Sequence, residues 1–337
     1  KRNNIKNKFT FWDSFPQVQK DMIEINQIIL KHVNSVPGLL GQALEDTFAV
    51  PGKMLRPACV MLFGAFGPDA DQKQDELKRI ATSIETLHNA TLIHDDIIDE
   101  SKLRRGYESI QSRFGKDTAV YAGDYLLTGM FSLLEQTNLP QANQLALTAL
   151  QDILFGELVQ KHHRFNVDAT FDTYLSQIKG KTAALFKLSV TFGLISGQAI
   201  ADDLQDTVSQ LGENLGITFQ LLDDYLDFES ITQQLSLGKP IGQDIRNGIY
   251  TAPVLFALTD PTVRDDIRAL LMQRDLISDA DMIRLHELIT QSHAMAKLNA
   301  LLTDYTEQLQ ALIGNLPEPT IQTQLEQLSQ LLLNRDH

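Results

Sequence analysis

Residues 201–229 read ADDLQDTVSQLGENLGITFQLLDDYLDFE, and this stretch decides the fold class. Its apolar residues return every three or four positions, which is the spacing of one face of an α-helix. No proline interrupts the pattern, and a proline inside a helix would remove a backbone hydrogen bond. The stretch therefore predicts a long amphipathic helix that ends in a run of aspartates. Its apolar face is Leu204, Val208, Leu211, Leu215, Phe219 and Leu222.

The same helical spacing continues through other parts of the chain. Pro140 is the only proline between Pro68 and Pro240, so two long stretches contain no helix breaker. No segment shows the alternation of a β-strand, and neither a Pro/Gly/Ser-rich linker nor a repeat marks a boundary. The sequence predicts one all-α domain over residues 1–337, with loops of interest at 50–57, 101–116 and 230–250. The expected helices span about 17–33, 39–49, 57–66, 72–100, 117–137, 141–165, 170–196, 201–229, 251–259, 262–275, 279–291, 294–314 and 319–334.

The composition excludes several classes of protein. Aspartate and glutamate number 43 against 29 lysines and arginines, and the net charge of −14 disfavours nucleic-acid binding. Any basic cluster in so acidic a chain points to a particular anionic ligand. The single cysteine, Cys59, cannot form an intramolecular disulfide, so we expect a cytoplasmic protein. No apolar run approaches about 18 residues, and Lys1–Thr10 has no apolar segment, so neither a membrane span nor a signal peptide is expected.

The first acidic motif, Asp95-Asp96-Ile97-Ile98-Asp99, closes the helix expected at 72–100. At about 100° per residue, Asp95 and Asp99 lie about 40° apart on one face, so both carboxylates point the same way. Like charges at this spacing repel each other, and the negative end of the helix dipole adds to the repulsion. A bound cation would relieve both effects. A solvated acidic helix end is the alternative interpretation.

A second acidic motif with the same spacing, Asp223-Asp224-Tyr225-Leu226-Asp227, ends the helix expected at 201–229. Both motifs follow apolar residues, which argues against an ordinary solvated surface. Carboxylates are hard oxygen ligands of the kind that Mg²⁺ prefers, and Mg²⁺ commonly shares its coordination with substrate phosphates. Zinc is not expected, because the chain has one cysteine and no histidine-rich ligand set. The pair of motifs predicts a site for Mg²⁺ and a phosphorylated substrate.

Four short basic segments lie near these motifs in the sequence. Arginine offers a planar fork for phosphate oxygens, whereas lysine acts as a mobile point charge. Any one segment alone could be a solvated turn, but next to two acidic motifs they are the expected phosphate-binding residues. The segments are Gly52-Lys53-Met54-Leu55-Arg56-Pro57, Arg104-Arg105-Gly106, Gly180-Lys181-Thr182 and Gly238-Lys239-Pro240.

In these motifs and their order the chain resembles the trans-type polyprenyl diphosphate synthases. The shared motifs are Gly-Lys-x-Leu-Arg-Pro, Leu-Ile-His-Asp-Asp-x-x-Asp followed by Arg-Arg-Gly, Gly-Lys-Thr-Ala, and Phe-Gln-x-x-Asp-Asp-x-x-Asp. The resemblance covers about residues 40–255 and is weakest over residues 1–40. It implies a single-domain orthogonal helical bundle of the isoprenoid synthase type, with a central cavity for diphosphate and Mg²⁺. It also implies a prenyltransferase that joins isopentenyl diphosphate to an allylic diphosphate.

The resemblance assigns roles to particular residues. Asp95, Asp96, Asp99, Asp223, Asp224 and Asp227 would hold Mg²⁺ ions that bridge the allylic diphosphate, and together with Lys181 they are the expected catalytic residues. Arg104, Lys181, Gln220 and Lys239 match positions that contact this diphosphate, with Thr182 next to Lys181. Lys53, Arg56, His88 and Arg105 match positions that hold isopentenyl diphosphate, although His88 could instead be a hydrogen-bonded core histidine. Two positions depart from the family pattern: Met54 stands where an arginine is often seen, and Ile249 where a lysine is common.

Other functions stay open at this stage. A metal phosphohydrolase with adjacent histidine and aspartate ligands would use His88, His94 and Asp95, but it leaves the second acidic motif unexplained. A terpene cyclase would need no isopentenyl site, and a non-catalytic subunit of a heteromeric synthase typically loses its acidic motifs. The resemblance implies a homodimer, and a second type of subunit is the alternative.

Three residues that precede the first acidic motif are expected to influence the length of the product. In short-chain members of the family, bulky aromatic residues commonly stand four or five positions before the first aspartate and block the growing tail. Here these positions are Thr91 and Ala90, and Leu87 lies about one helical turn deeper. We therefore expect a product longer than about C15, in the range of about C20 to C40, with a stop at Leu87 or at a bulky residue on a facing helix. Ala90 could instead serve close helix packing.

Overall fold

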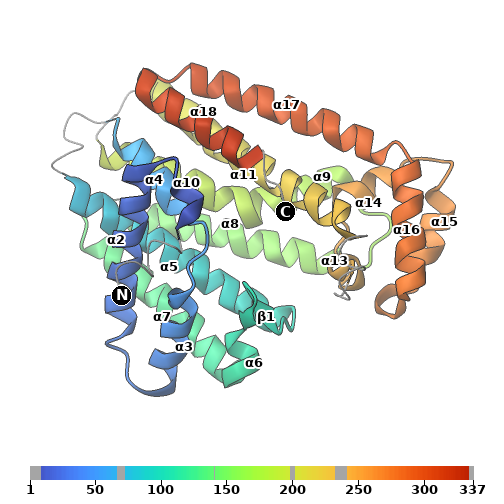
Figure 1. Ribbon diagram of the computed structural model, residues 1–337, viewed down its shortest axis with the longest axis horizontal. Coiled ribbons are helices and arrows are strands. Elements are labelled where there is room, and N and C mark those ends of the chain that lie inside the picture. The colour runs from blue at the N-terminus through green and yellow to red at the C-terminus, as the bar shows by residue number, and fades with distance from the viewer. Residues whose placement is uncertain (1–8, 67–72, 140, 198–201, 232–240, 334–337) are drawn as a thin grey trace. The chain divides into compact units, whose positions relative to one another are not determined.

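The computed structural model describes residues 9–66, 73–139, 141–197, 202–231 and 241–333. The chain groups into two compact units, which we describe separately. Unit 1 comprises Lys1–Leu147 and Leu188–Val208, and unit 2 comprises Thr148–Lys187 and Ser209–His337. Both units are helical (Figure 1), which confirms the all-α prediction apart from one short hairpin. The single domain expected from the sequence stays a prediction.

Unit 1 begins with a short 3₁₀ turn that leads into a long helix. Pro16 occupies the first position of that helix, where its missing N–H leaves no hydrogen bond unmade. The elements are η1 (Thr10–Trp12), α2 (Pro16–Val33), α3 (Gly38–Ala49), α4 (Leu55–Gly64), α5 (Gln74–Ile98), β1 (Leu103–Arg104), β2 (Tyr107–Glu108), α6 (Ile110–Phe114) and α7 (Lys116–Glu135). Three further helices contribute residues to both units: α8 (Ala142–His162), α10 (Ala184–Ser196) and α11 (Asp202–Glu229).

Helix α5 organises unit 1, because it packs against α2, α4 and α7. Asp75 and Glu76 stand in its first turn, where the positive end of the helix dipole favours acidic side chains. With neighbours on several sides, α5 buries polar residues such as Glu85 and Asn89 as well as apolar ones. The first acidic motif forms the last turn of this helix, with Asp99 as the C-cap residue. The fold thus fixes this motif to a largely buried helix.

Unit 2 contains the remaining elements. Two of its helices begin with the side-chain caps that Ser and Thr commonly provide, since Thr170 accepts from the Thr173 N–H and Ser278 from the Asp281 N–H. The elements are α9 (Phe171–Ile178), the π-helical segment η3 (Lys179–Ala183), α13 (Gln243–Arg246), α14 (Ala252–Ala257), α15 (Arg264–Leu271), η4 (Arg274–Leu276), α16 (Asp279–Gln291), α17 (Ala294–Gly314) and α18 (Pro319–Leu333).

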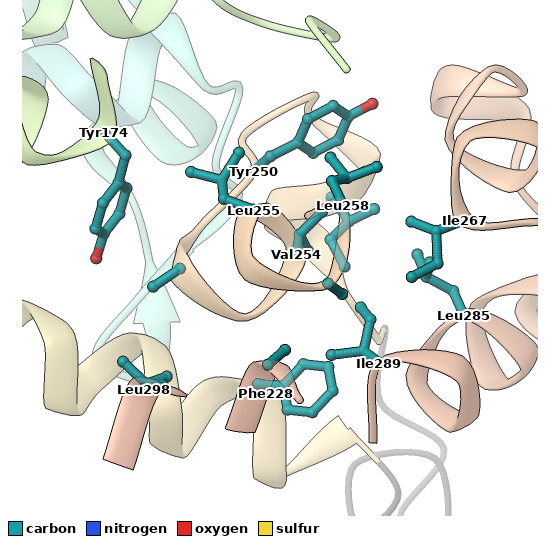
Figure 2. Close-up of a cluster of buried hydrophobic side chains, with 14 of the residues drawn as sticks. Tyr174, Phe228, Tyr250, Val254, Leu255, Leu258, Ile267, Leu285, Ile289 and Leu298 are labelled. Atoms are coloured by element: carbon teal, nitrogen blue, oxygen red, sulfur yellow. The ribbon is translucent and has the colours of Figure 1, made fainter. Parts of the chain in front are cut away.

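The core of unit 2 gathers around α14. Figure 2 shows Val254 and Leu255 of α14, and Leu258 directly after it, among buried side chains that come from other helices. Tyr174 of α9 lies at one edge of this cluster. Its ring is buried, so its hydroxyl group needs a hydrogen-bond partner inside the protein. The neighbouring side chains that the figure labels are Phe228 of α11, Ile267 of α15, Leu285 and Ile289 of α16, and Leu298 of α17.

The structure departs from the sequence prediction in several short elements. We expected no strand, yet residues 103–108 form a two-stranded antiparallel hairpin, whose strands are too short to show alternation in the sequence. The expected loops 101–116 and 230–250 contain α6 and α13. The helix expected at 170–196 is present, but it is divided by η3.

Candidate functional site

The hairpin that follows the first acidic motif directs two arginines to different partners. Arg104 pairs with Tyr107 across the hairpin, so Arg105 and Gly106 form the two-residue turn. Both turn residues have positive φ angles, 52° for Arg105 and 81° for Gly106, as a type I′ turn requires. A non-glycine residue in this conformation is uncommon, and such strained residues cluster at functional sites. The strained turn marks this hairpin as a candidate site element.

Arg104 binds the middle aspartate of the first motif. Its Nε lies 3.1 Å from Oδ1 and 3.2 Å from Oδ2 of Asp96, and its Nη2 also donates to Oδ1. Asp96 is 4% exposed, and burial raises the pKa of its carboxyl group while Arg104 acts in the opposite direction. Asp95 and Asp99 are partly exposed. The motif therefore divides into a buried aspartate with a protein partner and two outer aspartates on one face of the helix.

Arg56, His88 and Arg105 come together within unit 1. Nη1 of Arg56 lies 3.2 Å from Nε2 of His88, which joins α4 to α5. Arg105 donates from Nη1 to the Val50 carbonyl at 3.0 Å. Its guanidinium lies so close to Gly52 that a Cβ at that position would be 2.7 Å from Nη2. A side chain at position 52 would therefore displace the Arg105 guanidinium. Three residues predicted to share one subsite thus lie in one cluster.

His88 takes part in this cluster as a neutral ring. Arginine has no acceptor atom, so Nε2 of His88 must accept the hydrogen bond from Arg56 and the ring proton sits on Nδ1. Burial, and then the charges of Arg56, Arg105 and Arg104, lower the pKa of His88 well below its ordinary value. The ring can donate from Nδ1 to an anion without adding a positive charge. The structure shows His88 as a hydrogen-bonded histidine beside two arginines, and its contact with isopentenyl diphosphate stays a prediction.

A buried carboxyl group on α5 accompanies the two arginines. Glu85 lies one turn before His88 and is 3% exposed. Nδ2 of Asn89 donates to its Oε1 at 2.8 Å. Burial raises the pKa of Glu85, whereas attraction to Arg105, the bond from Asn89 and attraction to Arg56 lower it. The same attraction draws both guanidinium groups toward α5.

The loop before α4 carries Lys53 to the surface of unit 1. Lys53 is exposed, and its backbone carbonyl accepts a hydrogen bond from Nε1 of Trp12 at 2.7 Å. Met54 adopts a φ of 54° directly before α4 and is buried. The residue that departs from the family pattern is therefore a buried turn residue and not an exposed one.

In unit 2 the middle aspartate of the second motif also binds protein groups. Asp224 is 5% exposed and accepts a hydrogen bond from the Tyr174 hydroxyl. It accepts a second one from Nε2 of Gln220 at 2.9 Å. Oε1 of Gln220 in turn accepts from the Thr182 hydroxyl at 2.8 Å. These bonds connect the Gly-Lys-Thr segment to the second acidic motif.

The carboxyl group of Asp224 holds its proton more tightly than an ordinary aspartate. Burial raises its pKa to about 8 against the effect of the two hydrogen bonds, and Asp244 and Asp223 add to the rise. Burial and the neighbouring Asp224 also raise the pKa of Tyr174 well above its ordinary value. Asp223 is partly exposed and Asp227 is exposed. The second motif thus repeats the division seen in the first.

Lys181 lies in η3 and is held by two side chains of α8. Its Nζ lies 2.7 Å from Oε1 of Glu157 and 3.1 Å from Oε1 of Gln160. Helices α8 and η3 touch backbone to backbone, since a Cβ on Gly156 would lie 2.7 Å from the backbone nitrogen of Lys181 and one on Gly180 only 2.7 Å from a backbone oxygen of α8. A π-helical turn within a longer helix is frequent at functional sites. This contact fixes the backbone position of Lys181 relative to α8.

A small cavity of about 150 Å³ in unit 2 brings a third acidic segment to the second motif. Asp224 and Asp227 line it together with Asp244 of α13. The N–H of Ile249, the other departure from the family pattern, donates to the Asp244 carbonyl at 2.8 Å. Lys239, which the sequence assigns to the diphosphate site, lies outside the described residues.

The outer aspartates are the residues that fit Mg²⁺. Asp95 and Asp99 share one face at the end of α5, and Asp223 and Asp227 share one face at the end of α11. Carboxylate oxygens suit Mg²⁺, which usually keeps water and substrate phosphate as further ligands. Among the described residues no three His, Cys, Asp or Glu side chains converge as a ready metal site. An ion held by one of these motifs would therefore need phosphate oxygens or water as well.

The residues predicted to set product length lie on α5. Ala90 and Leu87 are fully buried, and Thr91 is partly exposed. Near this level α5 and α7 approach closely, because a Cβ on Gly123 would lie 2.1 Å from Nε2 of His94. The burial of Ala90 fits close helix packing, and the role of these residues in chain length stays a prediction.

Several residues of these clusters were not predicted from the sequence. Glu85 and Asn89 lie within the apolar run of α5, where a lone acidic residue was the only signal. Tyr174 reads as part of the apolar face of its helix. Glu157 and Gln160 share a helix face, at a spacing of three residues, with no link in the sequence to Lys181. Only the folded structure shows that Glu157 and Gln160 are partners of Lys181.

Comparisons with known proteins agree with the motifs. The family model for polyprenyl synthetase matches residues 37–289. The chain is 31% identical over 317 residues to heptaprenyl diphosphate synthase component 2 of Geobacillus stearothermophilus, which covers 94% of this chain and 96% of that protein. It is 34% identical over 286 residues to the chloroplastic solanesyl-diphosphate synthase 2 of Oryza sativa subsp. japonica, covering 83% and 70% of the two chains.

Solved structures show the same likeness in three dimensions. A geranylgeranyl pyrophosphate synthase from Lactobacillus brevis has a TM-score of 0.87 at 34% identity, covering 96% of this chain and 99% of that one. A heptaprenyl diphosphate synthase from Staphylococcus aureus also has a TM-score of 0.87, at 30% identity and with 95% and 99% coverage. The chain therefore shares the all-α fold of these enzymes over nearly its whole length.

Proposed function

The chain belongs to the polyprenyl synthetase family, and from this premise we propose that it condenses isopentenyl diphosphate with an allylic diphosphate to give a longer all-trans polyprenyl diphosphate. Heptaprenyl, solanesyl and geranylgeranyl diphosphate synthases are among its relatives, so the chain is a prenyltransferase. The finer assignments below concern its substrates, its metal and its assembly.

The observation that carries the proposal is the basic cluster in unit 1. Arg56 and Arg105 supply two guanidinium forks, and the neutral ring of His88 adds a donor beside Arg56. Such forks suit the oxygens of a diphosphate. The cluster uses different residues from the Asp96–Arg104 pair that follows the acidic motif. An enzyme that acted on one diphosphate alone would have no use for this second set of cations.

The residues proposed to serve the allylic diphosphate are Arg104, Lys181, Gln220 and Thr182. Arg104 and Lys181 offer positive charge to the diphosphate as its bond to the allylic carbon breaks, which stabilises the charge that develops there. Gln220 and Thr182 keep that region ordered through the hydrogen bond between them. The double bond of isopentenyl diphosphate then attacks the allylic cation, and the resulting cation loses a proton to the released diphosphate. His88 is poorly suited to take that proton, because Arg56 occupies its one acceptor atom.

We propose Mg²⁺ as the cofactor. Its donors would be the outer aspartates, Asp95 and Asp99 in unit 1 and Asp223 and Asp227 in unit 2. When bound there, Mg²⁺ would neutralise the negative charge of the diphosphate leaving group. Asp96 and Asp224 would act indirectly, since each already has protein partners.

The rival functions find less support. A phosphohydrolase with His88 and His94 as ligands does not fit, because His88 binds Arg56, and Nε2 of His94 lies 3.5 Å from Asp124. A terpene cyclase would leave the basic cluster unused. A non-catalytic subunit would not need two intact acidic motifs, whereas both are intact in this chain.

Incubation with the two substrates tests the proposal. The purified chain should release diphosphate in magnesium buffer only when isopentenyl diphosphate and an allylic diphosphate are both present. Release from the allylic substrate alone would instead support a cyclase or a hydrolase. Chromatography of the dephosphorylated product with isotopic isopentenyl diphosphate should show chains longer than about C15, for which we expect about C20 to C40.

The assembly is a further proposal. We infer a homodimer from the family resemblance, and the relative named component 2 gives the alternative of a second type of subunit. Activity of the chain purified by itself, with its mass in solution, separates the two. Among the described residues, no helix combines the length and the apolar character that crossing a bilayer requires. A cytoplasmic location stays a prediction.

A further inference from the structure

An aromatic segment that precedes α2 holds the loop that carries Lys53. The segment spans residues 9–15 and contains Trp12, the single tryptophan of the chain. Nε1 of Trp12 donates to the backbone carbonyl of Lys53 at 2.7 Å. Trp12 is fully buried, so loss of this bond would leave a polar group unpaired away from water, which is costly.

The neighbouring residue, Phe11, acts on the Lys53 side chain. The Nζ of Lys53 lies 5.4 Å from the centre of the Phe11 ring, within the range of a cation–π interaction. The rings of Phe11 and Trp12 meet edge to face with their centres 5.0 Å apart. One aromatic pair therefore contacts both the backbone and the ammonium group of Lys53.

The segment is itself fixed to α2. Nε2 of Gln19 donates to the Phe9 carbonyl at 3.0 Å and to Oδ1 of Asp13 at 2.7 Å. The backbone N–H of Phe15 donates to the Trp12 carbonyl at 2.9 Å, a bond that does not depend on the Phe15 side chain. A side chain that positions another residue needs a rigid support of this kind.

The Lys53 loop is a place where such support matters. Met54, the next residue, has a φ of 54°, a conformation that persists only when its surroundings hold it. Elsewhere in the loop, Arg105 bonds to the Val50 carbonyl and lies against Gly52. The loop is thus fastened by an arginine of the basic cluster and by the aromatic segment.

We propose that Trp12 and Phe11 are positioning residues for isopentenyl diphosphate, which they serve by fixing Lys53 in the binding loop. This inference rests on the proposed function of the basic cluster. Both aromatic residues lie outside residues 37–289, the part of the chain that the family model matches. The family model therefore assigns no role to this support.

Kinetics of two variants test the proposal. Trp12→Phe keeps an aromatic ring and removes the N–H donor, so the KM for isopentenyl diphosphate should rise about tenfold, the equivalent of about 1.4 kcal/mol. Phe11→Leu keeps an apolar side chain and removes the ring face, and should raise the same KM about threefold. The KM for the allylic substrate and kcat should stay within about twofold in both variants.

Phe15→Leu is the matched control. Phe15 packs on the same Trp12 ring, but no contact joins it to Lys53 among those the structure gives for its ring. Its loss should lower the melting temperature without changing the KM for isopentenyl diphosphate. A rise of both KM values together, or an equal rise in Phe15→Leu, would show that the segment acts only through stability.

Tryptophan fluorescence gives a second test that does not depend on turnover. Because Trp12 is the only tryptophan, its emission in the unmodified chain reports on the segment alone. Titration with isopentenyl diphosphate should change that emission, and Lys53→Ala should abolish the change. Binding seen by calorimetry without any change in emission would overturn the proposal. An emission change in a chain that makes no product would overturn the proposed function and leave the positioning role standing.

Discussion

The contact between Gly156 and η3 allows a sharp test of how Lys181 is placed. In Gly156→Ala the new Cβ would lie 2.7 Å from the backbone nitrogen of Lys181 and 3.1 Å from two further backbone atoms, the Gln177 oxygen and the Gly180 carbonyl carbon. Neither helix can yield by rotating a side chain. To reach an ordinary contact of about 3.4 Å, the two backbones must separate by about 0.7 Å.

This shift would move Lys181 relative to Glu157 and Gln160, which hold its ammonium group. Displacements of about 1 Å can cost about 100-fold in rate, so we expect kcat/KM for the allylic substrate to fall about 10-fold to 100-fold. That range corresponds to about 1.4 to 2.7 kcal/mol of transition-state stabilisation. Overpacking should also lower the free energy of unfolding by about 1 to 3 kcal/mol.

Gly129→Ala is the matched control for this prediction. Gly129 also lies within a helix, but a Cβ there would meet only Nε2 of His32, at 3.6 Å. Alanine is favoured over glycine inside a helix by about 1 kcal/mol, so this variant should be slightly stabilised and fully active. The assays are steady-state kinetics at saturating isopentenyl diphosphate and urea unfolding. If Gly156→Ala matches Gly129→Ala in both assays, backbone contact does not position Lys181.

Three further predictions concern the first acidic motif, the helix face that precedes it, and His88. Asp95→Asn should reduce kcat by orders of magnitude with the circular dichroism spectrum unchanged, whereas Asp96→Asn should mainly lower the melting temperature, because it removes the partner of a protein arginine; equal losses of kcat would contradict this division. Ala90→Phe should shift the products toward about C15 in chromatography, and an unchanged distribution would show that no channel runs along this face. The pKa of His88 is lower in the folded chain than in the unfolded one, so the free energy of unfolding should fall as the pH drops below about 6.5. The fall due to this group is at most about 1.4 kcal/mol per pH unit. In urea unfolding, the free energy of unfolding of His88→Gln should fall less steeply over the same pH range.

The sequence predicted the long helices well because their pattern is local. Helix α11 was expected at 201–229 and is found at Asp202–Glu229, and α5 was expected at 72–100 and is found at Gln74–Ile98. In both cases apolar residues at helical spacing continue over many turns, so the burial of one face outweighs local irregularities. Short helices such as α14 and α15 were also expected, but the 103–108 hairpin, α6 and α13 were not. The 103–108 hairpin depends on a two-residue turn with positive φ at an arginine, which no propensity favours.

The candidate site was predicted in its residue types but not in its pairings. The grouping of Arg56, His88 and Arg105 followed from the resemblance, and the structure brings them together. The hydrogen bond between Tyr174 and Asp224 joins residues 50 positions apart, and neither segment alone predicts this pairing. Pairings of this kind depend on how helices pack. A single sequence does not show packing directly.

The division within each acidic motif does follow from helix geometry. At about 100° per residue, the second residue of an Asp-Asp-x-x-Asp motif lies about 100° from the first, whereas the fifth lies only about 40° from it. The first and fifth residues therefore share a face, and the second is turned toward a flank. In one motif that flank meets Arg104, and in the other it meets Tyr174 and Gln220.

The two flanks remove negative charge from the motifs by different means. Asp96 is neutralised by the guanidinium of Arg104, and Asp224 keeps a proton near neutral pH because burial raises its pKa to about 8. Each motif then presents its two outer carboxylates on a single face. Two carboxylates balance the charge of one divalent ion. Three would repel one another more strongly at the negative end of the helix dipole. The buried middle aspartate thus reduces the repulsion within each motif, and in the proposed magnesium site the outer pair would provide the ligands.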